Sequence, residues 1–143
     1  MRLATLRREE GSMTIWMLGL CVMLLFLGGI SLDLWRAFAE RRALAERVDS
    51  AAVAGGSGID ESAFRANSVV QLDPARADAL AWANLNDQPT DPALLSQDVS
   101  ASTRTVTVSA TGQVHFTLLG VLLAGKPFII SVSATVQPEA GGP

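Results

Sequence analysis

Hydrophobic and polar positions form three patterns along the chain, and the first is an uncharged apolar run over residues 13–32. An α-helix rises about 1.5 Å per residue, so a helical run of this length is about 30 Å long, which matches the hydrocarbon layer of a bilayer. Trp16 and Trp35 stand near the two ends of the run, and indoles favour the headgroup regions. We therefore predict a transmembrane helix over residues 13–32.

The second pattern continues this helix beyond the apolar run. Ser12 is expected to cap the start of the helix. Glycines near residue 56 are expected to end it, because glycine readily takes the left-handed conformation of a helix cap. Apolar residues recur at intervals of three and four, the spacing of one helical face, at Leu34, Phe38, Ala45, Val48 and Ala52.

Residues 33–56 are accordingly predicted to form an extended stalk helix outside the membrane. Two opposite-charge pairs at i,i+4 spacing, Arg36 with Glu40 and Arg42 with Glu46, are expected on its solvated face. Residues 1–12 are then a short cytoplasmic N-terminus, and residues 57–143 form a small extracytoplasmic domain.

The third pattern belongs to this domain and mixes helix signals with strand signals. A short helix is predicted over residues 60–66, and Asp73 followed by Pro74 begins another that runs to about Asn86. A polar segment with prolines at residues 88–92 separates these helices from the strands. The predicted fold class is α+β, with a long N-terminal helix followed by short helices packed on an antiparallel sheet.

Strict alternation of apolar and polar residues predicts strands over residues 104–110 and 127–136, with a weaker third strand over 94–102. A bulge or turn near Gly112 is expected to separate the first of these from a continuation over residues 113–118. The inward positions of the last strand are predicted to be Phe128, Ile130, Val132, Ala134 and Val136.

Residues 116–125 form a second uncharged segment, which is too short to cross a membrane. One interpretation is a buried strand end and crossover loop. The other is an apolar tip that contacts a membrane or a partner, because exposed apolar clusters mark such surfaces. The residues that would make this contact are Leu118, Leu119, Val121, Leu122 and Leu123.

Glycines inside the predicted span form a further candidate site. Small residues let membrane helices approach one another closely, so Gly19, Gly28 and Gly29 are candidates for a helix-packing surface. Their spacing is not the GxxxG pattern.

Charge and reactive residues argue against catalysis and against nucleic-acid binding. The chain carries a formal net charge of −3, with no basic cluster in the domain. His115 is the only histidine and Cys21, inside the apolar run, the only cysteine. No metal-ligand spacing or phosphate-binding loop is present. We predict a protein that is not an enzyme, with no cofactor, no metal, no nucleic acid and no small-molecule substrate.

A cleaved signal peptide is the main alternative to a permanent anchor. The chain starts with basic residues, and Ala37-Phe38-Ala39 has the small-x-small shape of a cleavage site. The apolar run is longer than usual for a signal peptide, and Asp33 and Arg36 interrupt the approach to the alanines. Basic residues flank both ends of the run, so charge alone does not orient the helix. On this alternative the protein is a secreted binding domain that signal peptidase releases.

Several segments together resemble a known family. They are Arg7-Arg8-Glu9-Glu10-Gly11-Ser12-Met13-Thr14-Ile15-Trp16 before the apolar run, Asp33-Leu34-Trp35-Arg36-Ala37-Phe38-Ala39-Glu40-Arg41-Arg42 after it, and Val48-Asp49-Ser50-Ala51-Ala52-Val53-Ala54-Gly55. This ordered combination resembles the TadE/TadG-like family of Flp pilus-assembly proteins, of the actinobacterial kind. The resemblance covers residues 7–56 well and the remainder only in outline.

The resemblance implies a pilin-like membrane protein of a Tad-type pilus or secretion machine. It implies the cytoplasmic membrane as location, with a short N-terminus inside and the domain outside. The implied partners are the lipid bilayer, other Tad pilus-assembly membrane proteins and pilin subunits. Some relatives are cut after a glycine, which makes Gly11 and Ser12 the candidate processing site. Cutting there puts Trp16 where such peptidases favour an acid, so this chain departs from the pattern.

Overall fold

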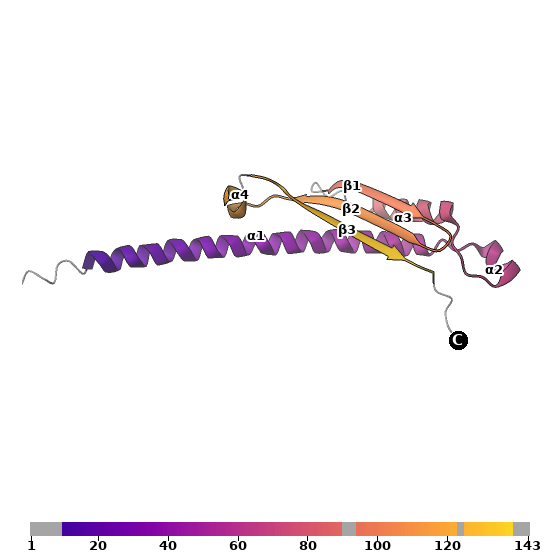
Figure 1. Ribbon diagram of the computed structural model, residues 1–143, viewed down its shortest axis with the longest axis horizontal. Coiled ribbons are helices and arrows are strands. Elements are labelled where there is room, and N and C mark those ends of the chain that lie inside the picture. Colours follow the sequence, from indigo (N-terminus) through magenta and orange to yellow (C-terminus); the bar gives the residue numbers. More distant parts are fainter. Residues whose placement is uncertain (1–9, 90–93, 123–124, 139–143) are drawn as a thin grey trace, which may run out of the picture.

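A computed structural model describes residues 10–89, 94–122 and 125–138 of the chain. It consists of one very long helix, with a small domain packed along the second half of that helix (Figure 1). The domain holds short helices and a three-stranded antiparallel sheet. The predicted α+β class and the order of its parts are therefore confirmed.

The long helix α1 runs without interruption through Glu10–Gly56, which is 47 residues and about 70 Å of helix. It begins ahead of Ser12, so the prediction that Ser12 caps its start is wrong. From Met13 to Leu27 the apolar side chains are exposed, because nothing else in the described residues packs on them. Among the described residues α1 is the one helix long and apolar enough to cross a membrane, and its most apolar stretch is not buried at all.

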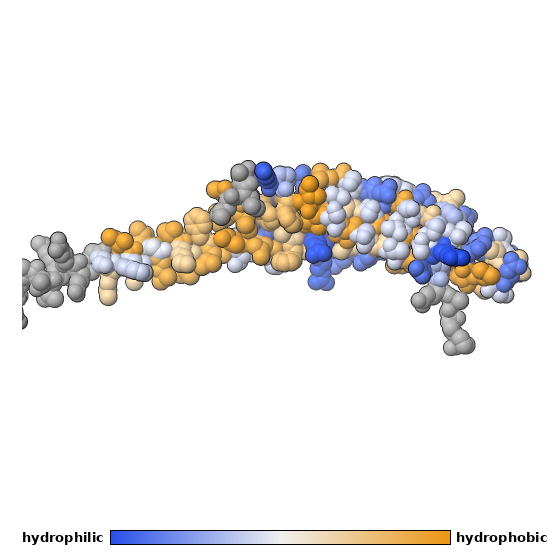
Figure 2. All heavy atoms as spheres, viewed as in Figure 1, coloured by the Kyte–Doolittle hydropathy of each residue, from blue (hydrophilic) through white to orange (hydrophobic). Residues whose placement is uncertain are grey.

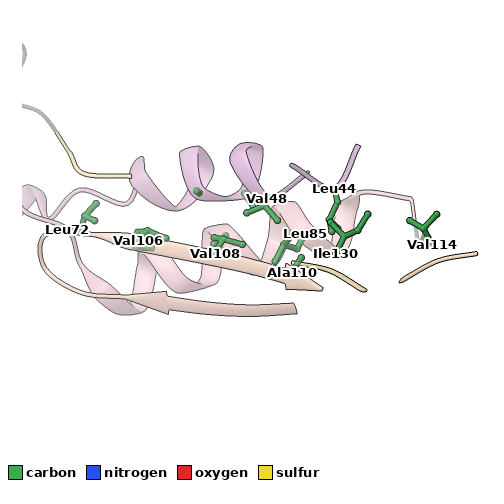
Figure 3. Close-up of a cluster of buried hydrophobic side chains, with 13 residues drawn as sticks. Leu44, Val48, Leu72, Leu85, Val106, Val108, Ala110, Val114 and Ile130 are labelled. Carbon is green, nitrogen blue, oxygen red and sulfur yellow. The ribbon is translucent and has the colours of Figure 1, made fainter. Parts of the chain in front are cut away.

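The second half of α1 is part of the hydrophobic core of the domain. Its residues Leu44, Val48, Ala51 and Ala52 are buried against the sheet and against the helix α3, Pro74–Asp87 (Figure 3). The opposite face of the same helical segment stays solvated, where Arg42 and Glu46 form the predicted i,i+4 ion pair at 2.9 Å. The segment predicted as a stalk therefore carries the domain along its side.

The end of α1 is fixed by close packing. None of Gly55, Gly56 and Gly58 has a positive φ, so the expected left-handed cap is not formed. A Cβ at Gly55 would lie 2.9 Å from Cγ1 of Val106, and one at Gly58 would lie 2.9 Å from Cα of Ala77. These glycines let the chain turn directly against its neighbours.

Two short helices follow. Helix α2 spans Glu61–Asn67 and is capped by Asp60, and helix α3 spans Pro74–Asp87 and is capped by Asp73, so both predicted helices are confirmed. The proline at the first position of α3 has no N–H to leave unpaired. Ala77, Ala81 and Leu85 form its buried face, which packs on α1.

The sheet has the order β1-β2-β3, with β1 at Leu94–Ala101, β2 at Val106–Val114 and β3 at Phe128–Val136. Along β2 every second residue, from Val106 to Val114, is buried, as the alternation predicts. The residues predicted to break the chain before β1 at Thr90, Asp91 and Pro92 lie outside the described residues.

Three strand predictions are wrong in detail. The irregularity expected near Gly112 lies on the opposite strand, where β1 has an extra residue at Leu95 between Leu94 and Ser96. Strand β2 ends at Val114, and the chain then forms a short helix, α4 at Leu118–Leu122. Phe128 is expected to face inward, but it is exposed, because the space between the start of β3 and α1 is open.

Removing a side chain from the centre of the core should lower the stability of the domain strongly. We expect Leu85→Ala to lower the free energy of unfolding by about 2–5 kcal/mol, because Leu85 is completely buried between α1 and the sheet. Urea unfolding in detergent, followed by the fluorescence of Trp82 in a Trp16→Phe, Trp35→Phe background, measures this loss. Val53→Ala, at an exposed position of α1, should change stability little.

Candidate functional site

The carboxylate of Asp33 joins the long helix to α4 through three hydrogen bonds at the end of the apolar run. We call this contact the junction. One oxygen of Asp33 accepts a hydrogen bond from the N–H of Thr117 at 3.1 Å. The other accepts from the N–H groups of Leu118 at 2.7 Å and Leu119 at 2.8 Å. The first N–H groups of a helix have no partner within the helix, so Asp33 caps α4 from a distant part of the chain.

The packing around this carboxylate is tight. Asp33 directly follows the apolar run, whose side chains are exposed, yet Asp33 itself is only 3% exposed. One turn earlier on α1, a methyl group of Leu118 occupies the place that a Cβ at Gly29 would take. On the outer side, Nη1 of Arg36 donates to the hydroxyl of Thr117 at 3.4 Å. Gly29, Asp33 and Arg36 therefore form one stripe of α1 on which α4 rests.

A groove opens beside the junction, between α1 and the start of β3. It has a volume of about 450 Å³ and a mainly apolar lining, made of Leu34, Ala37, Phe38, Arg41, Phe116 and residues 128–131. The rings of Phe116 and Phe128 meet on its wall, with centroids 6.0 Å apart and planes at 46°. The sheet, α1 and the segment after β2 thus share one exposed apolar border.

The candidate contact residues of the second uncharged segment lie on α4 and not in a strand end. Leu118 and Leu119 are half-buried against α1, whereas Val121 is 80% exposed. Leu122 is the last residue of α4, and Leu123 lies outside the described residues. The interpretation of this segment as a buried strand end is therefore wrong, because the Asp33 carboxylate accepts from the N–H groups of residues 117–119 and so favours the start of a helix.

The other candidate residues are distributed along α1. Gly19 and Gly28 have open space where a side chain would be, and Gly29 is covered by Leu118 of the same chain. Gly11 and Ser12, the candidate processing site, lie in the first turn of the helix. In the part of the chain that the structure describes, none of these positions lines the groove, and Gly29 alone among them contacts α4.

Titratable residues show no grouping for catalysis or metal binding within the described part of the chain. No three His, Cys, Asp or Glu residues there lie close enough together to hold a metal ion. Cys21 is exposed on the apolar half of α1, and His115 is exposed directly after β2.

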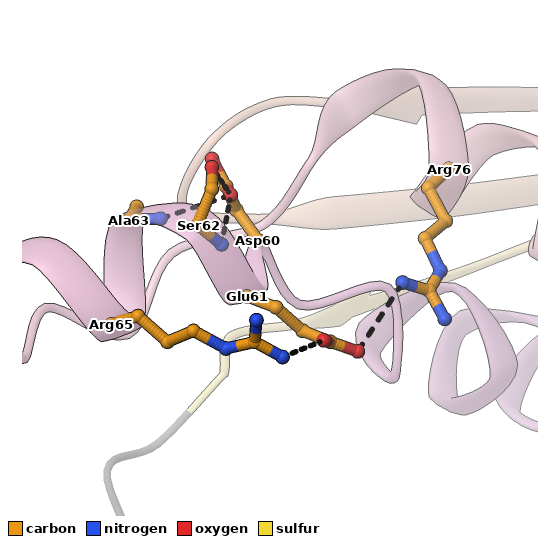
Figure 4. Close-up of polar contacts among 6 residues, drawn as sticks. All are labelled: Asp60, Glu61, Ser62, Ala63, Arg65 and Arg76. Carbon is orange, nitrogen blue, oxygen red and sulfur yellow. Dashed lines mark hydrogen bonds and ion pairs between the residues drawn. The ribbon is translucent and has the colours of Figure 1, made fainter.

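A second capping carboxylate lies in the loop after α1 (Figure 4). One oxygen of Asp60 accepts from the Ser62 hydroxyl at 2.6 Å and from the N–H groups of Ser62 at 2.9 Å and Ala63 at 3.1 Å. The hydroxyl of Ser62 and then the N–H of Ala63 lower the pKa of Asp60 below its ordinary value of 3.8. Beside this cap, Glu61 pairs with Arg65 at 3.0 Å and with Arg76 at 3.9 Å, both on the surface.

The role of Asp33 was missed by the sequence analysis, in which this residue only marked the end of the apolar run. The sequence did hold one indication. An acid directly follows an apolar run long enough to cross a bilayer, where an unpaired carboxylate is energetically unfavourable. Its partners are backbone N–H groups, which no side-chain pattern reveals.

Removing the Asp33 carboxylate should release α4. In the Asp33→Ala variant we expect the amides of residues 117–119 to lose most of their protection against hydrogen exchange, because three N–H groups lose their acceptor. Hydrogen exchange with peptide-level mass spectrometry measures this. Asp60→Ala, which removes a capping carboxylate from α2, is the matched control and should leave residues 117–119 protected. Unchanged protection in Asp33→Ala would contradict the cap.

The Asp60 cap predicts a component of acid sensitivity. Because folding lowers this pKa, ionised Asp60 stabilises the domain above about pH 4, and this stabilisation is lost as the pH falls through the lowered value. Asp60→Asn should therefore show a smaller decrease of urea-unfolding midpoint between about pH 6 and about pH 2 than the unchanged protein. Asp98→Asn, on an exposed strand position, controls for the loss of one surface carboxylate. Identical pH profiles for Asp60→Asn and the unchanged protein would exclude this contribution.

Comparison with known proteins found one family model that matches the N-terminal part of the chain. Residues 11–64 match the model of the putative Flp pilus-assembly TadE/G-like family. The matched segment extends from the start of α1 into α2. The resemblance seen in the sequence is confirmed over this segment, and the family is one of structural and assembly proteins. No curated protein and no solved structure matches the chain.

Proposed function

We propose that the protein is a membrane-anchored structural component of a Tad/Flp-type pilus assembly or secretion apparatus. The family match over residues 11–64 supports a role related to pilus assembly. Within that role, the chain is a single-pass protein of the cytoplasmic membrane, with its N-terminus inside and its domain outside. It works by helix packing in the bilayer and protein contacts outside it, and not as an enzyme.

The observation that carries this proposal is that the apolar helix and the domain share contacts. A signal peptide is separated from the folded protein, so a domain has no need to pack on it. Here Asp33 caps α4, Leu118 packs on Gly29, and Ala37 packs on the core. Cutting after Ala39 would remove all three contacts. Retention of the helix as an anchor therefore agrees better with the fold than a secreted binding domain does.

The uncovered surface of α1 supports a lipid environment. The side chains of Met13–Leu27 gain nothing from the domain, and a water-exposed surface of this size and composition is unfavourable. A bilayer covers such a helix completely while its backbone bonds remain internal. Gly19 and Gly28 keep space for a second helix, so other Tad membrane proteins or pilin subunits are the proposed partners at this level.

The proposal predicts the form of the protein in the cell. In a membrane fraction, mass spectrometry should find an N-terminus at the start of the chain or at Ser12, and carbonate should not extract the protein. Ala39→Leu, which places a bulky residue at the end of the small-x-small motif, should change neither result. A soluble form that begins at Glu40, and whose formation Ala39→Leu blocks, would instead establish the secreted alternative.

A further inference from the structure

The position of α4 along the long helix fixes its depth relative to the apolar run. Leu118 packs on Gly29, which precedes the end of the run at Leu32 by about 4–5 Å of helix. Asp33, the first charged residue after the run, accepts hydrogen bonds from the first N–H groups of α4. Because both contacts are on one helix, α4 lies where the apolar run ends, whatever the tilt of the helix.

The surface that the domain shows at this level is apolar. Val121 is 80% exposed on α4, and Ile129 and Phe128 are 61% and 54% exposed at the start of β3. Figure 2 shows the hydrophobic colour continuing from the first half of α1 onto the end of the domain that bears α4. We call Leu118, Leu119, Val121, Phe128 and Ile129 the apolar tip.

The surroundings of the apolar tip have the composition of a membrane interface. Trp35 and Phe38 are exposed on the adjacent turns of α1, and aromatic side chains favour the headgroup level. Arg36, Arg41 and Lys126 are exposed nearby, against one exposed acid, Glu40, because the carboxylate of Asp33 is hydrogen-bonded to the amides of α4. The rim therefore carries an excess of positive charge, which complements anionic headgroups.

We propose that the apolar tip is embedded in the interfacial layer of the outer leaflet, so that the domain is attached to the bilayer at two places, α1 and α4. This inference rests on the proposed anchoring of α1. The bilayer is the occupant because the tip continues the surface of the helix that lipid already covers, at the same depth. Asp33 is the positioning residue, since its carboxylate holds α4 at that depth.

The test measures how close Val121 lies to lipid in the full-length protein. With Cys21 replaced by alanine, Val121→Cys is labelled with an environment-sensitive NBD fluorophore. The protein is reconstituted into vesicles of phosphatidylcholine and phosphatidylglycerol that carry nitroxide-labelled lipid. We expect a nitroxide near the headgroup to remove most of the NBD emission, and one deep in the acyl chain to remove less.

Two labelled variants set the scale. Leu25→Cys lies inside the apolar run and should be quenched most by the deep nitroxide. Val69→Cys is a matched exposed valine in the segment after α2, at the opposite end of the domain from α4, and should not be quenched (Figure 1). Adding Asp33→Ala should reduce quenching at position 121 and leave quenching at position 25 unchanged.

The outcomes separate the two proposals. Quenching at position 25 without quenching at position 121 would overturn the embedded tip and leave the anchor intact. Loss of quenching at both positions would overturn the anchor itself. A blue-shifted but unquenched label at position 121 would show that protein covers the tip, which also overturns the lipid assignment. Quenching at 121 that persists in Asp33→Ala would remove Asp33 from its positioning role.

Discussion

Helix α1 is exposed along its first half, and one face of its second half is buried in the core of the domain. The rest of the structure depends on this change along one helix. The first half has apolar residues on all sides, as a helix in lipid requires. The second half has one apolar stripe, from Leu44 to Ala52, and a charged outer face. The domain packs on that stripe and could not form a core of this kind without it (Figure 3).

Between the two halves, the composition of α1 changes from a run without charge to a segment with charged residues. Asp33 stands at this point, and its ionised form is stabilised by three N–H groups instead of by water. The same three bonds begin α4, whose five residues are too few to form a stable helix alone. One carboxylate therefore makes its own burial acceptable and orders a segment distant in sequence.

The elements of the domain could be predicted from sequence wherever the signal was local. Asp73 and Pro74 define the start of α3, and the alternation around Val106 and Val108 defines β2, because capping and strand periodicity act between near neighbours. The junction could not be predicted in this way. The pairing of Asp33 with Leu118 joins residues far apart in the chain, and the extra residue at Leu95 depends on how β1 meets β2. The glycines around the end of α1 were correctly expected to end it, but the expected reason was a left-handed cap. In the structure Gly55 and Gly58 instead pack closely on Val106 and Ala77.

The continuity of α1 has a mechanical consequence. No loop separates the apolar half from the half that carries the sheet, and α4 braces the transition from the side. A hinge would allow the domain to reorient independently of the apolar half, whereas a continuous helix transmits rotation and translation along its axis. Screwing the apolar half forward by one residue would therefore advance the whole domain by about 1.5 Å and turn it by about 100°. Movement of the apolar end of α1 is therefore converted into displacement of the end that carries the domain, and a load on the domain returns to the apolar end along the same axis.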